Sequence, residues 1–295
     1  MYELHHLKGN TYYIDGPTNV GLYKLNETDV CLIDCGLKEE GPIIETLLRK
    51  NNLKLKYIID THSHPDHSGA NLYLMKMTGC KIIASKIERA FLRDSKLDIG
   101  FLYGGYPLDE FDTKVMHIDD NKEIYSLEEI PEGLRSFKLP GHHYGMIGVK
   151  TSDGVYFVVD TLGSKTLIEK QHILLIYDVS GYLKSLDFVE SLEGHIIVPA
   201  HSEVTTEIKD LVEFNRAKIY EIMHLILEIT KTPKTTEDII EEVFNHYKLH
   251  ISYNKYLLIS STMRSYIAYL SNKKRLRNYF ENNRLYFISN EEEFY

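Results

Sequence analysis

The residues with the clearest capacity for chemistry lie between Thr61 and Asn71, where the chain reads THSHPDHSGAN. Neutral histidine nitrogens are common ligands of transition metals, and carboxylates complete hard or borderline metal sites. His62 and His64 stand two positions apart, so in an extended segment their side chains point to the same side. Pro65 favours such a backbone at His64. This spacing predicts one pair of metal ligands.

A second pair follows at once, because Asp66 and His67 come directly before Ser68 and Gly69. A solvated polar turn is the alternative interpretation, and it suits a lone histidine better than four neighbouring donors. Loops at strand ends commonly carry functional residues. We therefore expect a metal site at the end of the preceding strand.

The elements around this stretch alternate between strand-like and helix-like patterns, which is typical of sheets covered by helices. Strands are expected at residues 18–25, 29–36, 55–60, 80–85, 135–141, 147–161 (two strands joined by Asp153-Gly154), 172–177 and 195–200. Helices are expected at residues 41–52, 69–79 and 183–194. Residues 94–117 fit neither period, and they are expected either to cover a site or to form an ordinary surface excursion.

The pattern changes after His201. Helices are expected at residues 208–230, 235–247 and 256–271, followed by a hairpin at 275–289. Thr235 can cap the second helix, with Asp238 placed for a reciprocal contact. Three helices and a hairpin indicate a small winged-helix-like, mainly helical domain. We predict domains at residues 1–206 and 207–295.

Composition limits the class of protein. The 295 residues carry a formal net charge of −9, which disfavours a surface built entirely for nucleic acid. The N-terminus has no apolar core and the longest apolar run is far shorter than a membrane span, so we expect a cytoplasmic protein without membrane contact. Three cysteines, Cys31, Cys35 and Cys80, do not indicate a disulfide framework, and Cys31 and Cys35 in the strand pattern VCLIDCG are interpreted as small core residues.

The sequence THSHPDH resembles the His-x-His-x-Asp-His signature of the metallo-β-lactamase superfamily. The other landmarks of that family follow in order, with Asp34 in LIDCG, Gly141-His142 in LPGHHYG, Asp160 in VVDTLG and His201 in VPAHS. The resemblance covers residues 19–201. It implies an α/β fold, an αββα sandwich with a two-metal site along one edge of its sheets.

Carried over by position, the resemblance divides the ligands into two sets. One metal ion would be held by His62, His64 and His142, and the second by Asp66, His67 and His201. Asp160 would bridge them, and Asp34 would support the ligand loop. The donor set suits two divalent ions, zinc best, and would also accept iron, manganese or cobalt.

This chain departs from the family pattern in several places. His143 and Tyr144 replace the Thr-Pro that hydrolytic relatives often carry; His142 follows Pro-Gly as in the family and is the predicted ligand. No cysteine occupies a motif position, which disfavours β-lactam hydrolysis. Pro65 stands where redox di-iron relatives usually carry a carboxylate, which disfavours oxygen reduction.

Two cations close together lower the pKa of a shared water to roughly 7, so hydrolysis by a metal-bridging hydroxide is the expected reaction. Asp66, Tyr144 and His143 are the predicted carriers of the leaving-group proton. The motif form resembles that of glyoxalase II-like thioester and lactone hydrolases. We therefore expect a small-molecule ester or thioester as substrate.

Two other readings stay open. The helical domain resembles that of an RNA-cleaving branch of the superfamily, and the basic residues between Arg264 and Arg284 could face a phosphate backbone, giving a phosphodiesterase or ribonuclease. A solvated helix end is the plainer interpretation of that basic run. The domain could also pack beside the site or form a homodimer contact.

In a non-enzymatic reading, the metals are structural and the winged helix binds DNA. Structural metals require a closed coordination shell.

Overall fold

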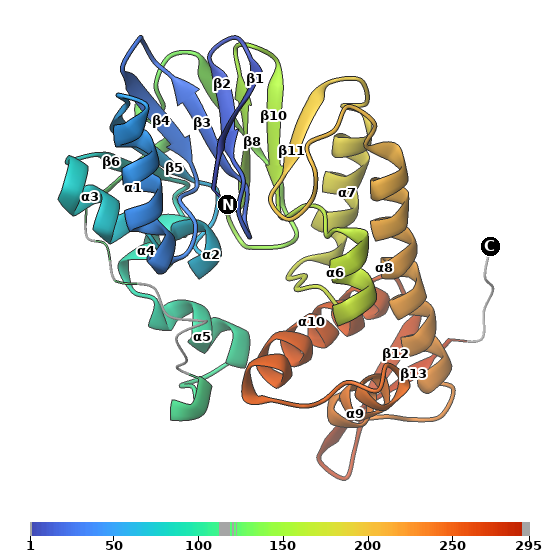
Figure 1. The fold of residues 1–295 in the computed structure, drawn as a ribbon. Helices are drawn as coiled ribbons and strands as arrows, with labels where there is room; N and C mark the ends of the chain where they lie inside the picture. Colours follow the sequence, from blue (N-terminus) through green and yellow to red (C-terminus); the bar gives the residue numbers. More distant parts are fainter. Residues whose placement is uncertain (1, 112–118, 120, 122, 291–295) are drawn as a thin grey trace.

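The computed structural model describes residues 2–111, 119, 121 and 123–290, and its strands form two large sheets and a separate hairpin (Figure 1). The larger sheet has the order β1 (Leu4–Lys8), β2 (Thr11–Ile14), β3 (Val20–Lys24), β4 (Asp29–Ile33), β5 (Lys54–Asp60), β6 (Lys81–Ala84) and β7 (Ile124–Tyr125). The second sheet has the order β11 (Ile196–Pro199), β10 (Val155–Val159), β9 (Ile147–Thr151) and β8 (Leu134–Lys138). Strands β4, β5 and β6 are parallel, and so are β10 and β11.

The two sheets face each other across an apolar core. Because successive strand residues point to opposite faces, Cys31 and Ile33 of β4 turn inward while Val30 and Leu32 turn outward. The inward residues pack against Val149 and other side chains of the smaller sheet. This alternation gives the sandwich its inner layer.

Helices cover the outer faces of the sandwich. The larger sheet carries α1 (Gly41–Lys50) and α3 (Asn71–Thr78), and α7 (Val179–Glu190) packs into the core behind the smaller sheet (Figure 1). The shorter helices are α2 (Pro65–Ser68), α4 (Glu88–Arg93), α5 (Lys96–Tyr103), α6 (Lys165–Gln171) and the 3-10 turns η1 (Lys38–Glu40), η2 (Asp109–Phe111) and η3 (Leu127–Glu129). The layers thus follow the expected αββα order.

The C-terminal region contains three helices and a hairpin. These are α8 (Lys209–Ile229), α9 (Thr236–His246), α10 (Tyr253–Asn272), β12 (Leu276–Glu281) and β13 (Arg284–Ser289). Thr235 caps α9 as expected, through a reciprocal contact with Asp238. One buried core runs without interruption from Leu186 of α7 through Val212 of α8 to Tyr266 of α10. The helices of the C-terminal region therefore complete the outer layer behind the smaller sheet.

Two sequence expectations are wrong. Residues 172–177 form no strand; their Ile173 and Ile176 lie in the core shared with the C-terminal helices. Burial between helices produces the same apolar run as burial in a sheet, so the pattern alone could not separate the two. Residues 96–103 form helix α5, because Ile99 and Leu102 pack against Leu257 of α10. Residues 112–117 of the expected irregular segment lie outside the described residues.

Cys31, Cys35 and Cys80 are free and buried, which confirms the interpretation of Cys31 and Cys35 as core residues. Burial raises the pKa of each thiol, so none is primed to react. Among the helices of the described residues, none is long and apolar enough to cross a membrane.

Candidate metal centre

The polar residues singled out in the sequence gather where strands of both sheets end. His62 and His64 follow β5, Asp66 and His67 lie in α2, His142 follows β8, Asp160 follows β10 and His201 follows β11. Carboxyl ends of parallel strands meet at one edge of a sheet, which brings residues distant in sequence together. The structure thereby forms two groups of potential ligands that share Asp160.

The first group consists of His62, His64, His142 and Asp160, whose nearest donor atoms lie within 4.8 Å of one another. His64 Nδ1 is 2.9 Å from His62 Nε2 and 3.0 Å from His142 Nε2. Asp160 Oδ2 is 3.4 Å from His142 Nε2. Three imidazole nitrogens and one carboxylate oxygen therefore face a common point.

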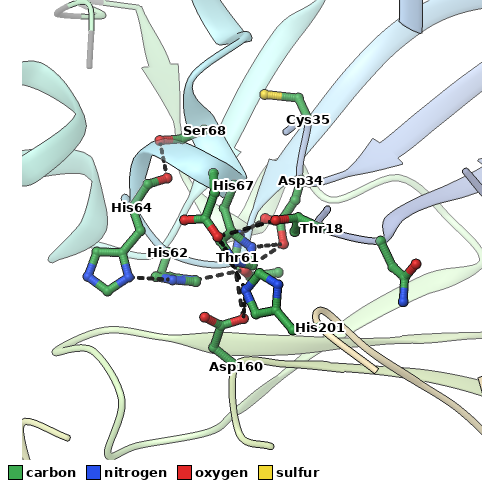
Figure 2. A network of polar contacts seen from close by, with 12 residues as sticks. Thr18, Asp34, Cys35, Thr61, His62, His64, His67, Ser68, Asp160 and His201 are labelled. Atoms are coloured by element: carbon green, nitrogen blue, oxygen red, sulfur yellow. Dashed lines mark hydrogen bonds and ion pairs between the residues drawn. The ribbon is translucent and has the colours of Figure 1, made fainter. Parts of the chain in front are cut away.

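The second group consists of Asp66, His67, Asp160 and His201. His67 Nε2 lies 3.1 Å from Asp160 Oδ1, and His201 Nε2 lies 3.2 Å from Asp66 Oδ2 and 3.4 Å from Asp160 Oδ1. Asp160 thus offers one oxygen to each group. Figure 2 shows its contacts with the second group. Thr18 donates a hydrogen bond of 3.2 Å to Asp66 and helps to fix that carboxylate.

Asp34 holds the ligand loop from behind (Figure 2). Its carboxylate accepts hydrogen bonds from the Thr61 backbone N–H at 2.8 Å, from the Thr61 hydroxyl at 2.9 Å and from His67 Nδ1 at 2.8 Å. Donation from Nδ1 leaves the lone pair of His67 on Nε2, which faces the cluster. The backbone φ of Asp34 is 63°, a left-handed conformation that aspartate tolerates better than most residues.

Backbone carbonyls orient two further histidines. His142 donates from Nδ1 to the carbonyl of Leu175 at 3.0 Å, and His201 donates from Nδ1 to the carbonyl of Pro17 at 2.9 Å. In each case the opposite nitrogen, Nε2, faces the cluster. Such outer contacts fix the tautomer that a metal requires.

The charge state of the first group suits metal binding. Burial lowers the pKa of His62, of His64 (to about 3) and of His142, and neighbouring histidines lower the first two further. These imidazoles are therefore neutral near pH 7 and present lone pairs, which is the form that binds metal. Neutral nitrogens 2.9 and 3.0 Å apart with lone pairs directed at one another repel unless a cation or proton lies between them. The donor set of the first group thus fits a metal ion.

In the second group, the carboxylates and the histidines shift one another's pKa. Burial alone would lower the pKa of His67 and His201, but the Asp160 and Asp66 carboxylates raise both values, that of His201 to about 10. The same contacts keep the pKa of Asp160 well below its usual range despite its burial. His67 Nε2 and Asp160 Oδ1 are buried and lie 3.1 Å apart, without the geometry of a hydrogen bond. Two carboxylates and two imidazoles in this state can exchange a proton for a metal ion.

His143 lies beside the first group and forms, with His64 and Asp98, a third buried group of potential ligands. Its Nδ1 contacts the two oxygens of Glu88 at 2.8 and 2.9 Å, and its Nε2 contacts Asp98 at 3.2 Å. Glu88 also accepts hydrogen bonds from the backbone N–H groups of Ser63 and Gly145. Burial opposes the charge, but Glu88 and Asp98 raise the pKa of His143 to about 10. Both ring nitrogens are thus engaged by carboxylates.

Tyr144 lies on the surface next to this cluster. Its side chain is partly exposed, and its ring packs 4.7 Å from that of Tyr177 and 5.4 Å from that of Phe101, measured between centroids. Among the described residues that line the pocket at the metal centre, neither Tyr144 nor His143 occurs, whereas Asp66 does. The roles of Asp66, Tyr144 and His143 in proton transfer remain predictions.

A pocket of about 610 Å³ opens in front of both groups. Its lining includes the ligand candidates His64, Asp66, His142, Asp160 and His201. The rest of its wall comes from Pro17, Leu37, Pro65, Tyr182, Leu258 of α10 and nine residues of one segment: Leu162, Gly163, Ser164, Thr166, Leu167, Lys170, Gln171, Leu174 and Leu175. The site is therefore accessible to a small molecule.

The sequence did not single out several residues that shape this centre. Glu88, Asp98, Thr18 and the carbonyls of Pro17 and Leu175 belong to no spaced motif. Their positions depend on segments that meet only in the fold, and a backbone carbonyl has no residue type to recognise. No local pattern could have identified them.

The chain belongs to the metallo-β-lactamase superfamily, whose family model matches residues 13–201. A probable metallo-hydrolase of Methanocaldococcus jannaschii, MJ0888, is 29% identical over 147 residues, covering 48% of this chain and 61% of that protein. The hydroxyacylglutathione hydrolase of Pelagibacter ubique is 35% identical over 91 residues, covering 30% of this chain and 35% of that protein. The chain thus spans between about a third and three fifths of the length of these relatives.

Solved structures of the same fold include the C-terminal region. A β-lactamase domain protein from Burkholderia ambifaria gives a TM-score of 0.74 at 14% identity, covering 98% of this chain and 94% of that one. A metallo-β-lactamase family protein from Thermus thermophilus gives 0.69 at 16% identity, covering 98% of each chain. This confirms the expected fold class.

Proposed function

We propose that the protein is a metal-dependent hydrolase that holds two divalent cations and cleaves an ester or thioester of a small molecule. His62, His64 and His142 would hold one ion, and Asp66, His67 and His201 the other. Asp160 would contact both. The observation that carries the proposal is the placement of Asp160, which offers one oxygen to each of two converging ligand groups at the head of an open pocket.

When bound, two divalent cations would supply Lewis acidity that lowers the pKa of water and polarises the scissile carbonyl. Hydrolysis adds the water oxygen to the acyl carbon and breaks the carbon–sulfur or carbon–oxygen bond, and the leaving sulfur or oxygen takes up a proton. Asp66 is the best-placed carrier of that proton among the predicted residues. Its side chain is 33% exposed and lines the pocket. Zinc is the metal we propose first, because imidazole and carboxylate ligands suit it.

Several observations support this proposal over the structural-metal reading. Catalytic sites keep an open coordination position, whereas structural sites are closed. The pocket reaches ligands of both groups, which agrees with an open position on each. The relatives named metallo-hydrolase and hydroxyacylglutathione hydrolase make ester and thioester cleavage the first reactions to test.

The proposal predicts that removing the shared carboxylate abolishes both metal and activity. We expect about two metal equivalents in the wild-type protein by elemental analysis. His62→Ala combined with Asp160→Asn should lose metal and at least 100-fold in kcat/KM for acetyl thioester hydrolysis, because each group loses a ligand. His250→Ala, an exposed histidine between α9 and α10, is the matched control. Full metal retention in the double variant would refute the site.

The same assay should separate the ester reading from the nuclease reading. The metal-loaded protein is offered esters, thioesters, bis(p-nitrophenyl) phosphate and RNA. We expect the acyl substrates to give the higher kcat/KM. Faster cleavage of the phosphodiesters, with a rate that falls as salt rises, would instead support the phosphodiesterase.

A further inference from the structure

Apart from the candidate ligands, the wall of the pocket consists largely of leucine side chains. These are Leu37, Leu162, Leu167, Leu174, Leu175 and Leu258. All six are buried or half-buried, whereas Thr166, Lys170 and Gln171 of the same lining are exposed. The inner part of the pocket is therefore aliphatic, and its polar side chains lie at the rim.

Four of these leucines belong to one segment, residues 162–175, which surrounds helix α6 directly after Asp160. The segment links the shared ligand to the outer layer of the sandwich. Its Leu175 also supplies the carbonyl that orients His142. One segment thus carries four of the six leucines, follows Asp160 directly and contacts His142.

The C-terminal helices hold this segment at both ends. At one end, Gly163 and Asn215 of α8 exchange two buried hydrogen bonds of 2.9 Å, one from the Gly163 N–H to Asn215 Oδ1 and one from Asn215 Nδ2 to the Gly163 carbonyl. At the other end, the Ile176 N–H donates to the hydroxyl of Thr262 of α10 at 3.2 Å. Leu258 of α10 closes the wall directly. Figure 1 shows α6 beside α8 and α10.

The pocket lining carries one lysine in addition to the candidate ligands. Apart from the candidate ligands, Lys170 is the one charged side chain among the described residues that line the pocket. It is exposed and lies in the last turn of α6. An apolar wall stabilises a hydrocarbon chain, and a single rim ammonium favours an anionic group.

We propose that the substrate is a thioester or ester of an aliphatic acyl group longer than acetyl, whose leaving group carries an anionic charge. The acyl chain packs on the leucine wall, and the anion lies near Lys170. Water adds to the acyl carbon, the carbon–sulfur or carbon–oxygen bond breaks, and the leaving sulfur or oxygen takes up a proton. The products are a carboxylic acid and an anionic thiol or alcohol. The inference rests on the proposed function and gives the C-terminal region a part in substrate selection.

The test varies the two ends of the substrate separately. Acetyl, butyryl and hexanoyl thioesters are prepared on 3-mercaptopropionate, which is anionic, and on 3-mercaptopropionamide, its neutral analogue. Each fully buried methylene contributes about fourfold to transition-state binding. We expect kcat/KM to rise at least tenfold from acetyl to hexanoyl, and the anionic series to exceed the neutral one by about threefold or more.

Two variants and their controls assign these effects to residues. Leu258→Asn should reduce the hexanoyl-to-acetyl ratio at least fivefold, and Ile251→Asn, an exposed position before α10, should not change it. Lys170→Gln should abolish the preference for the anionic series. Lys165→Gln, at the other end of α6 and outside the pocket lining, should retain that preference.

The outcomes separate the inference from the proposed function. Hydrolysis of all thioesters with no dependence on chain length would overturn the leucine wall as an acyl site and leave the hydrolase assignment intact. Absence of any acyl hydrolysis by protein loaded with two metal equivalents would refute both. Should Leu258→Asn fail to fold, inhibition of the wild type by hexanoate and acetate replaces it. Equal inhibition constants would also overturn the inference.

Discussion

At the scale of single residues, the centre depends on groups that hold the ligands as much as on the ligands. Asp34 accepts three hydrogen bonds from the ligand loop, and Glu88 joins the backbone of Ser63 to that of Gly145. Each anchor is buried and charged, so it fixes its partners in one geometry. The loss of such an anchor should therefore act on metal affinity before it acts on the fold.

The first residue-scale prediction concerns Asp34. Asp34→Asn keeps the size of the side chain but replaces one accepting oxygen by a donor, so one of its contacts with Thr61 or His67 must break. We expect a 10- to 100-fold loss of affinity at the ion held by His67, as is typical for residues that orient ligands. Competition titration with a chelator measures it. Asp153→Asn, which removes a comparable carboxylate from the remote hairpin, is the control, and equal affinities would contradict the prediction.

The second residue-scale prediction concerns the charge on His143. Its pKa of about 10 in the folded protein lies above the value of roughly 6.5 in the unfolded chain, so between these values the folded state binds the extra proton. The stabilisation is therefore complete below pH 6.5 and is lost as the pH rises through 10. His143→Gln should cost about 3–5 kcal/mol at pH 6 and much less near pH 10.

Urea unfolding at pH 6, 8 and 10 measures this difference, with His250→Gln as the control. A cost that stays constant with pH would mean that His143 acts through packing and not through its charge. A large change in the pH profile of kcat with unchanged stability would restore its predicted role as a proton carrier.

At the scale of elements, the geometry of the loops at the strand ends decides which side chains meet. His142 follows Gly141, whose φ is 130°, and a Cβ there would overlap the backbone of Tyr182 in α7. The loop after β8 can therefore approach α7 only with glycine at this position. That approach places the His142 ring against Leu175 and His64.

The prediction at this scale is that Gly141→Ala displaces His142. We expect the melting temperature to fall and the protein to lose one metal equivalent, because the added methyl group overlaps the backbone of Tyr182. Gly194→Ala is a matched control, since its φ is 85° but nothing lies within 4 Å of the added atom. A control that loses as much stability and metal would show that backbone strain, and not the contact with α7, explains the effect.

At the scale of the whole molecule, the C-terminal region and the sandwich share one core. Ile208 and Val212 pack in the same cluster as Val189 of α7, and Asn215 bonds to Gly163 in the pocket segment. The predicted boundary at residue 206 falls just before α8, where the chain changes from sheets to helices. The boundary separates the sandwich from the C-terminal helices along the chain, but the two parts share one hydrophobic core.

The prediction at this scale is a single cooperative unfolding transition. We expect calorimetry of the metal-free chain to give equal calorimetric and van't Hoff enthalpies, because unfolding of either part exposes the shared core. Asn215→Ala should lower the midpoint of that one transition. Two separate transitions, with only the later one affected by Asn215→Ala, would show that the parts fold independently.

The amino-acid sequence by itself determined sheets covered by helices and the ligand candidates between His62 and His67, because spaced histidines and an aspartate at a strand end leave a local pattern. The αββα order and the remaining ligand candidates followed from the resemblance to the metallo-β-lactamase superfamily. The sequence also determined the three C-terminal helices, through their apolar period and the Thr235 cap. It could not place Glu88, Asp98 or the Leu175 carbonyl, which approach the ligands only after the loops have folded. Nor could it show that residues 172–177 lie between helices, since burial of either kind leaves the same apolar run. The leucine wall was decided by the tertiary structure alone, because Leu258 joins the segment after Asp160 only when the C-terminal helices close over the sandwich.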